Sequence, residues 1–120
     1  MNGYKDLVVW QKSMDLVMAV YESTEHFPKS EIFGLISQMR RCSVSIPSNI
    51  AEGSRRRTQK DFRQFLTIAY GSGAELETQI EIAKRLAFGK QLDYREVDNL
   101  LSEVMKMLNK MLSNFNSYQN

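Results

Sequence analysis

Apolar residues recur in this chain at spacings of three and four positions, which is the repeat of one face of an α-helix. The first such stripe consists of Trp10, Met14, Val17 and Tyr21, widened by Leu16 and Val20. It predicts a helix over about residues 8–25, with Asp6 as its N-cap. Pro28 disfavours helical backbone at the preceding Phe27, so the helix should end there.

A second stripe predicts a helix over about residues 31–53, and its members are Ile32, Leu35, Met39, Cys42 and Ile46. Ser30 is a suitable N-cap, and Gly53 is a suitable C-terminal stop. Pro47 lies inside this segment, where it removes a backbone donor and crowds the Ser43 carbonyl. We expect a kink or a helix restart there, with Ser43 or Ser45 bonding to the freed groups. The alternative is that the kink shapes a binding surface.

The second half of the chain carries two longer stripes. The third stripe predicts a helix over about residues 59–88, capped by Thr58 and Asp61, and comprises Phe62, Phe65, Ala69, Gly73, Leu76, Ile80, Ala83 and Ala87. The fourth predicts a helix over about residues 94–116, after a cap at Asp93, and comprises Val97, Leu101, Val104, Leu108, Met111 and Phe115. Gly71 and Gly73 each cost about 1 kcal/mol relative to alanine inside a helix, so a neighbouring helix or chain should approach closely there.

Four helices joined by short connections predict an antiparallel up-down-up-down bundle. Spacings close to 3.5 residues favour near-parallel packing with a left-handed supercoil. The chain of 120 residues contains only two prolines and six glycines, and its length suits one core, so a single domain over residues 1–120 is expected. We therefore predict an all-α, left-handed four-helix bundle whose second helix is kinked at Pro47.

Composition indicates the cellular compartment in which this protein is expected. Hydrophobic residues make up 42% and charged residues 25%, which is ordinary for a soluble globular domain. The sequence contains no apolar run long enough for a membrane span, and its first residues lack a signal-peptide core. The lone Cys42 cannot form an internal disulfide, which suits a reducing compartment. A cytoplasmic protein without membrane contact is expected.

Residue types that usually carry catalysis or bind metals are sparse. His26 is the only histidine, which excludes a two-histidine metal site within one chain. Cys42 lies on an apolar stripe, where a packed thiol is favoured over a nucleophile. Three glutamates also cluster in the third predicted helix: Glu75, Glu77 and Glu81. A solvated face, or ion pairs with Arg40 or Arg41, explains them better than acid–base chemistry. We predict a non-enzyme without a metal or cofactor.

Charge is distributed unevenly along the chain. The segment from Arg40 to Arg63 has seven basic and two acidic residues, a charge of +5, whereas the remainder has a charge of −3. Its densest part consists of Arg55, Arg56, Arg57, Lys60 and Arg63. Arginine forks match phosphate oxygens, so a nucleic acid is the natural polyanionic partner. A solvated turn, or pairing with acidic residues of another subunit, is the alternative. Because no aromatic residue lies among the three consecutive arginines, contacts to phosphate are expected rather than base stacking.

Several polar residues fall where the second and third helices should meet. They are Gln38, Arg41, Asn49 and Glu52 in the second helix, and Glu75 and Gln79 in the third. A buried polar network of this kind would fix the register of the two helices.

Six segments of the chain resemble one known family. They are residues 6–12, 27–31, 33–35, 38–41, 45–53 and 65–72. The family comprises four-helix bundle proteins first recognised as open reading frames in intervening sequences of bacterial 23S ribosomal RNA genes. The resemblance covers about residues 4–115 and implies a left-handed four-helix bundle that commonly assembles as a homopentamer. Motif residues that match are Arg41, Pro47, Asn49, Glu52 and Gly53, and their role is either structural or functional.

The resemblance also implies distant relatives with a known role. These include the accessory variability determinant of diversity-generating retroelements, a basic pentamer that binds nucleic acid and its reverse transcriptase. By that analogy in fold, we expect a homo-oligomer that binds RNA, or alternatively DNA, through Arg55–Arg63. The competing hypothesis is an oligomeric scaffold or accessory subunit for a protein such as a reverse transcriptase, without direct contact to nucleic acid.

Overall fold

The computed structural model describes residues 3–119, with side-chain environments described as far as residue 115. Over residues 3–119 the elements are all helical, which confirms the predicted all-α class. The four α-helices are α1 (Val8–Thr24), α2 (Ser37–Ser54), α3 (Gln59–Arg85) and α4 (Arg95–Gln119). Three short turns of helix accompany them: η1 (Gly3–Asp6) precedes α1, and η2 (Lys29–Glu31) and η3 (Ile32–Ile36) lead into α2.

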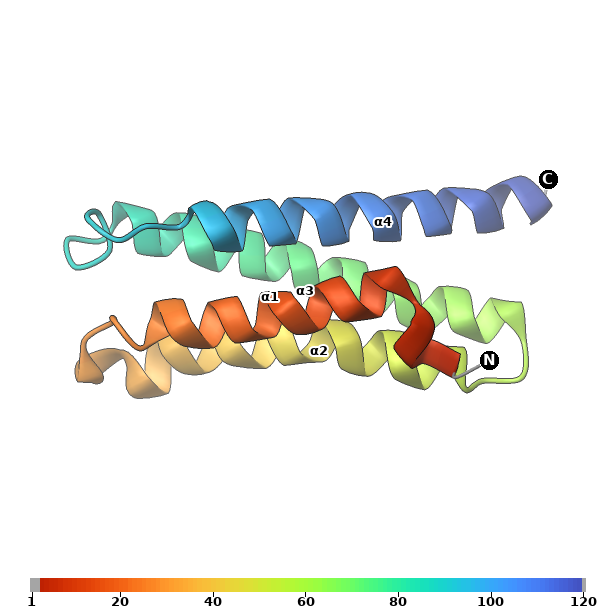
Figure 1. Cartoon of the computed structure of the whole chain (residues 1–120), viewed down its shortest axis with the longest axis horizontal. Helices are drawn as coiled ribbons and strands as arrows, with labels where there is room; N and C mark the ends of the chain where they lie inside the picture. The colour runs from red at the N-terminus through yellow and green to blue at the C-terminus, as the bar shows by residue number, and fades with distance from the viewer. Residues whose placement is uncertain (1–2, 120) are drawn as a thin grey trace.

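The helices lie side by side in an elongated bundle of 47 × 27 × 22 Å (Figure 1). Each helix in Figure 1 runs in the opposite direction to the one before it, and α4 returns to pack against α1. The α2–α3 connection, η1 and the end of α4 therefore lie at one end, and the other two connections lie at the opposite end. The left-handed twist of the bundle stays a prediction. None of the helices within residues 3–119 combines the length and the apolar character that crossing a bilayer requires.

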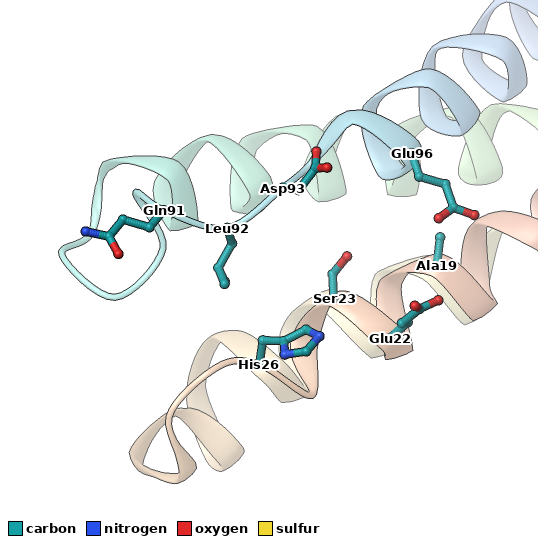
Figure 2. Close-up of a pocket in the computed structure, with 8 residues that line it drawn as sticks. All are labelled: Ala19, Glu22, Ser23, His26, Gln91, Leu92, Asp93 and Glu96. Atoms are coloured by element: carbon teal, nitrogen blue, oxygen red, sulfur yellow. The ribbon is translucent and has the colours of Figure 1, made fainter.

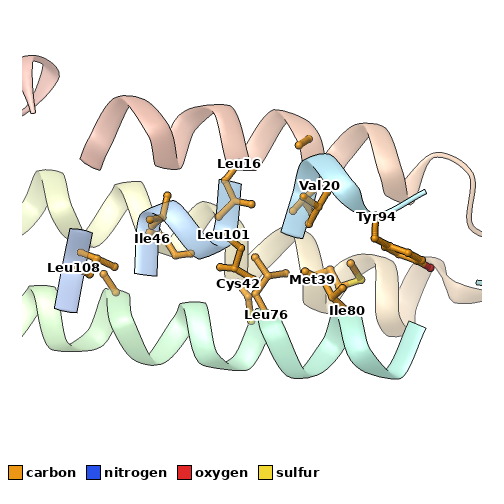
Figure 3. Packing of buried hydrophobic residues seen from close by; sticks show 14 of the residues in the cluster. Leu16, Val20, Met39, Cys42, Ile46, Leu76, Ile80, Tyr94, Leu101 and Leu108 are labelled. Carbon is orange, nitrogen blue, oxygen red and sulfur yellow. The ribbon is translucent and has the colours of Figure 1, made fainter. Parts of the chain in front are cut away.

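A continuous apolar core runs along the bundle axis and receives side chains from all four helices (Figure 3). Its fully buried members include Leu16 of α1, Ile46 of α2, Leu76 of α3 and Leu108 of α4, each with 0% exposure. Burying a side chain of this size contributes about 1.5–3 kcal/mol relative to leaving it in water. Packing of these faces, rather than helix propensity, therefore supplies most of the stability of the helices.

The buried face of α1 is displaced by one residue from the predicted stripe. The fold buries Val9, Ser13, Leu16, Ala19, Val20 and Thr24. The predicted Trp10 and Val17 are only partly buried, and Met14 and Tyr21 are 38% and 39% exposed. Ser13 Oγ donates to the Trp10 carbonyl at 2.8 Å and Thr24 Oγ1 donates to the Val20 carbonyl at 2.8 Å. Because both hydroxyls are satisfied on their own helix, these two polar residues can enter the core at little cost.

The start of α2 also differs from the prediction. Helix α1 has Leu7 rather than Asp6 at its N-cap, and the side chain that caps the entry to α2 belongs to Glu31 rather than Ser30. Glu31 Oε1 accepts a hydrogen bond from the Leu35 amide at 3.2 Å. Gly34 has non-helical backbone angles (φ −110°, ψ −113°), so the predicted helix over 31–53 is interrupted before α2 begins.

Pro47 is buried within α2, which is assigned without interruption from Ser37 to Ser54. The predicted kink at Pro47 stays a prediction, and the clear irregularity of this segment is at Gly34. Ser43 Oγ donates to the Arg40 carbonyl at 2.8 Å, one turn earlier in the same helix.

Helices α3 and α4 begin much as the sequence predicts. Thr58 Oγ1 accepts from the Asp61 amide at 3.1 Å, which confirms the N-cap of α3. Asp93 Oδ1 accepts from the Arg95 amide at 3.0 Å at the start of α4. Helix α3 ends at Arg85, so Ala87 lies exposed in the connection and not in the core. The pattern also missed one core residue of α3, Leu66, which is 0% exposed.

Helices α2 and α3 approach each other closely near the turn that joins them. Gly53 is buried, and a Cβ atom placed on it would lie 2.6 Å from Phe65 Cβ and 3.0 Å from Phe62 Cδ1. The close packing of the two helices therefore requires glycine at position 53. The sequence predicts Gly53 as the C-terminal stop of this helix, and α2 continues one residue further, to Ser54. Further along the same interface, the hydroxyls of Ser45 and Ser72 share a hydrogen bond of 2.9 Å.

The two glycines inside α3 have different environments. Gly73 is buried, and a Cβ atom there would overlap the Met105 sulfur of α4, which confirms close approach of a neighbouring helix. Gly71 is exposed, and a Cβ atom there would meet nothing within 4 Å. The glycine at position 71 is therefore not required by packing within the chain.

We predict that Gly53→Ala destabilises the protein by about 1–2 kcal/mol, because overpacking against Phe62 and Phe65 outweighs the higher helix propensity of alanine. The control is Gly71→Ala, which should stabilise the protein by about 0.5–1 kcal/mol, since the new methyl group enters open space. Urea unfolding of both variants, compared with the parent protein, measures the two changes. Equal effects of the two substitutions would contradict the assigned packing at Gly53.

Candidate nucleic-acid interface

The turn between α2 and α3 holds the three consecutive arginines at one end of the bundle (Figure 1). Arg55, Arg56 and Arg57 are all exposed, as the sequence predicts. Only four residues separate α2 from α3, and Gly53 and Phe65 pack together just inside the turn. There is therefore no space for the three guanidinium groups between α2 and α3, and they lie on the outer surface of this end of the bundle.

Two of these arginines lie over aromatic rings. The Arg55 guanidinium carbon lies 5.3 Å from the ring centroid of Tyr4 in η1, and that of Arg56 lies 4.9 Å from the ring centroid of Phe65. Cation–π contacts of this kind contribute about 0.5–1 kcal/mol at exposed sites and restrict the side chain. Tyr4 is distant in sequence, so only the fold of η1 against α2 reveals its contact with Arg55.

The basic residues differ in how strongly the chain already engages them. Arg56 Nη2 forms an ion pair with Glu52 Oε1 at 3.0 Å, so one of the three arginines is partly neutralised within the chain. Arg57 and Lys60 are exposed, and Arg63 is partly buried on α3. The surface formed by Arg55, Arg56, Arg57, Lys60 and Arg63 is called the basic end below.

The motif residues are spread along α2, from Arg41 in its first half to Glu52 and Gly53 next to the basic end. Pro47 and Gly53 are buried, and Asn49 Nδ2 donates to the Ser45 carbonyl at 2.8 Å. Arg41 and Glu52 are exposed, and Arg41 Nη2 donates to Gln38 Oε1 at 3.3 Å. The predicted buried network is therefore wrong for Gln38, Arg41 and Glu52, because long charged and amide side chains reach solvent from the edge of the interface.

A smaller set of polar groups joins α2 to α3, and it includes Glu75 and Gln79 of the predicted network. Cys42 Sγ donates to Glu75 Oε2 at 3.1 Å and accepts from Gln79 Nε2 at 3.4 Å. Burial, followed by the hydrogen bond to Glu75, raises the pKa of the Cys42 thiol from 9.0 to about 11. Cys42 is 6% exposed, which confirms the predicted packed thiol. Its raised pKa keeps the thiol protonated at neutral pH, which disfavours a role as a nucleophile.

The opposite end of the molecule carries exposed residues of both charges, among them Glu22 and Lys29. A pocket of about 340 Å³ lies there between α1 and the α3–α4 connection, and Figure 2 shows Glu22, His26, Asp93 and Glu96 around it. Hydrogen bonds from Arg95 lower the pKa of Asp93 from 3.8 to about 2, so this carboxylate stays ionised. No lysine or arginine lines the pocket. Within residues 3–119, no group of three or more His, Cys, Asp or Glu side chains is arranged to hold a metal ion.

Comparison with known families agrees with the sequence and the fold. The model of the 23S rRNA-intervening sequence protein family matches residues 5–110. The chain belongs to this family. The matched range contains all five motif residues and all five residues of the basic end. No curated protein matches the chain. The distant similarity to the accessory variability determinant stays a prediction.

We predict that the protein loses stability between pH 9 and pH 11 through Cys42. The unfolded thiol ionises near its ordinary pKa of 9.0, whereas the folded thiol holds its proton to about 11, so rising pH favours the unfolded state in this window. Urea unfolding at several pH values measures the loss, with Cys42→Ala as the control that removes this titration. A parent protein and variant whose stability difference is constant across the window would contradict the assignment.

Proposed function

We propose that this member of the 23S rRNA-intervening sequence protein family is a non-enzymatic, homo-oligomeric protein that binds RNA through its basic end. The observation that carries the proposal is the arrangement of Arg55, Arg56 and Arg57 on the outside of a tight turn, next to Lys60. Each guanidinium offers a planar fork of donors that matches phosphate oxygens. The description of the family supports RNA over DNA as the nucleic acid.

The charge distribution supports a directed encounter with a polyanion. The segment from Arg40 to Arg63 carries +5, whereas the rest of the chain carries −3. The pocket at the opposite end is lined by Glu22 and Glu96, which repel phosphate, whereas Asp93 is already paired with Arg95 at 2.7 Å. A polyanion approaching this molecule is therefore oriented toward the basic end. Repetition of that end around an oligomer, such as the pentamer that the family resemblance implies, would multiply the attraction.

A second candidate function is an oligomeric scaffold that binds a protein partner, such as a reverse transcriptase. The observation that favours it is Phe33, which is 96% exposed at the entry to α2, with Ile32 beside it 47% exposed. A fully exposed phenylalanine is the type of side chain that anchors protein interfaces. In this alternative, the arginines meet an acidic protein surface.

The proposal predicts salt-dependent binding that charge reversal at the basic end abolishes. Replacing Arg55, Arg56 and Arg57 together by glutamate should reduce the affinity for a labelled RNA stem-loop by at least about 100-fold, since phosphate contacts dominate such affinities. The control replaces Lys29, Arg85 and Lys90, exposed residues toward the opposite end, by glutamate, with the same change in net charge. Fluorescence anisotropy at several salt concentrations measures binding.

The proposal fails if the parent protein shows no salt-dependent binding, or if both triple variants bind alike. Co-purification from a nuclease-treated lysate distinguishes the scaffold hypothesis from RNA binding, because a protein partner survives nuclease treatment and an RNA does not. Light scattering of the purified protein reports the number of subunits.

We further predict that Glu52→Gln strengthens RNA binding by about two- to fivefold. The substitution removes the ion pair that engages Arg56, and exposed pairs of this kind are worth about 0.2–1 kcal/mol. Glu81→Gln is the matched control, because Glu81 forms the corresponding i,i+4 pair with Arg85 at 3.5 Å, away from the basic end. The same anisotropy titration measures both variants. Equal effects of the two substitutions would show that net charge alone, and not release of Arg56, changes the affinity.

A further inference from the structure

A mainly apolar pocket of about 340 Å³ lies between η1, α1 and α2, beside the basic end. The residues that line it include Tyr4, Trp10, Met14, Val17, Ser48 and Ala51. The pocket results from the displaced register of α1. Because the fold turns Val9, Ser13 and Leu16 to the core, the face with Trp10, Met14 and Val17 flanks α2 and remains partly accessible.

Two aromatic side chains form part of the pocket wall. Tyr4 and Trp10 contact each other edge to face, with ring centroids 5.4 Å apart. Arg55 lies over the Tyr4 ring, so a guanidinium group is fixed at the boundary of the pocket. Ser48, Ala51 and Arg55 follow one another at spacings of three and four residues, which places them along one side of α2. The pocket and the basic end are therefore continuous.

We propose that this pocket binds an unpaired nucleobase of the RNA, while Arg55 binds the adjoining phosphate. The inference rests on the proposed function and specifies the form of RNA that this end recognises. Aromatic and aliphatic walls suit the faces of a base, and the hydroxyls of Tyr4 and Ser48 can hydrogen bond to its edge. The volume lies within the range of about 300–1,000 Å³ that is usual for ligand pockets. A base held in a duplex cannot enter, so single-stranded or looped RNA is preferred.

A second copy of the chain is the competing occupant of this apolar surface. The adjoining cation favours RNA, because an apolar pocket bordered by a guanidinium matches the two parts of a nucleotide, a base and a phosphate. A protein neighbour would have to supply an acidic group at the same border. The experiment below separates the two occupants.

Trp10 is the only tryptophan of the chain and lines the pocket, so its fluorescence reports occupancy directly. Titration with a short single-stranded RNA should change Trp10 emission, whereas inorganic polyphosphate, which has phosphates but no bases, should bind without that change. A fully paired RNA duplex should also leave the emission unaltered. Anisotropy of the labelled RNA, measured in parallel, reports binding independently of the pocket.

Two substitutions test the pocket without removing any basic residue. Ala51→Leu fills the pocket, and Tyr4→Leu removes one aromatic wall. Each should weaken binding of single-stranded RNA about tenfold, or about 1.4 kcal/mol. Ala51→Leu, which keeps the contact between Tyr4 and Arg55, should also leave polyphosphate binding unchanged. Tyr21→Leu is the matched control, because Tyr21 also lies beneath an arginine, Arg40 at 4.5 Å, but that arginine pairs with Glu25 at 3.0 Å. Circular dichroism verifies that each variant is folded.

The possible outcomes separate the pocket from the proposed function. RNA that binds without changing Trp10 emission, or that binds the Ala51 and Tyr4 variants as tightly as the parent protein, overturns the pocket and leaves the basic end as the RNA site. Absence of any salt-dependent RNA binding overturns both. Emission that changes with protein concentration but not with RNA assigns the pocket to a second copy and overturns the proposal.

Discussion

The close packing of α2 against α3 is the constraint on which the basic end depends. Gly53 permits this approach, since any side chain there would overlap Phe62 and Phe65. The helices are then joined by a turn too short and too tightly packed to take in a guanidinium group. Burial of three such charges would in any case require acidic partners, and the buried polar residues described up to residue 115 include no aspartate or glutamate. The three arginines of the turn are therefore exposed because α2 and α3 pack tightly against each other beneath them.

The fold was largely predictable from periodicity, but the details depended on hydrogen bonds that periodicity does not reveal. Val97, Leu101, Val104 and Leu108 are buried as predicted, because α4 is amphipathic without ambiguity. In α1, serine and threonine occupy core positions and satisfy their hydroxyls on the preceding turn. A pattern that counts only apolar residues therefore selects the neighbouring face, whose larger Trp10 and Tyr21 side chains are more hydrophobic but lie at the edge of the core.

The candidate site was predictable only in part for a related reason. The exposure of Arg55, Arg56 and Arg57 followed from charge alone, since isolated guanidiniums are rarely buried. The aromatic rings beneath two of them could not be predicted from the local sequence. Phe65 reaches Arg56 across the turn, and Tyr4 reaches Arg55 from η1, about fifty residues earlier in the chain. The expectation of phosphate contacts without base stacking considered only the residues next to the arginines in the sequence. It did not include aromatic residues that the fold brings close to them.

The same displacement of α1 connects the error in the core to the chemistry of the surface. Had Trp10 and Val17 entered the core, they would not have lined the pocket between α1 and α2. Instead, Ser13 and Thr24 occupy the interior, and the aromatic face is left beside Arg55. An apolar surface adjoining fixed positive charge has two complementary affinities, one for a planar ring and one for an anion. A nucleotide unites both in one covalent unit, and in our proposal this is how the basic end would distinguish looped or single-stranded RNA from paired RNA.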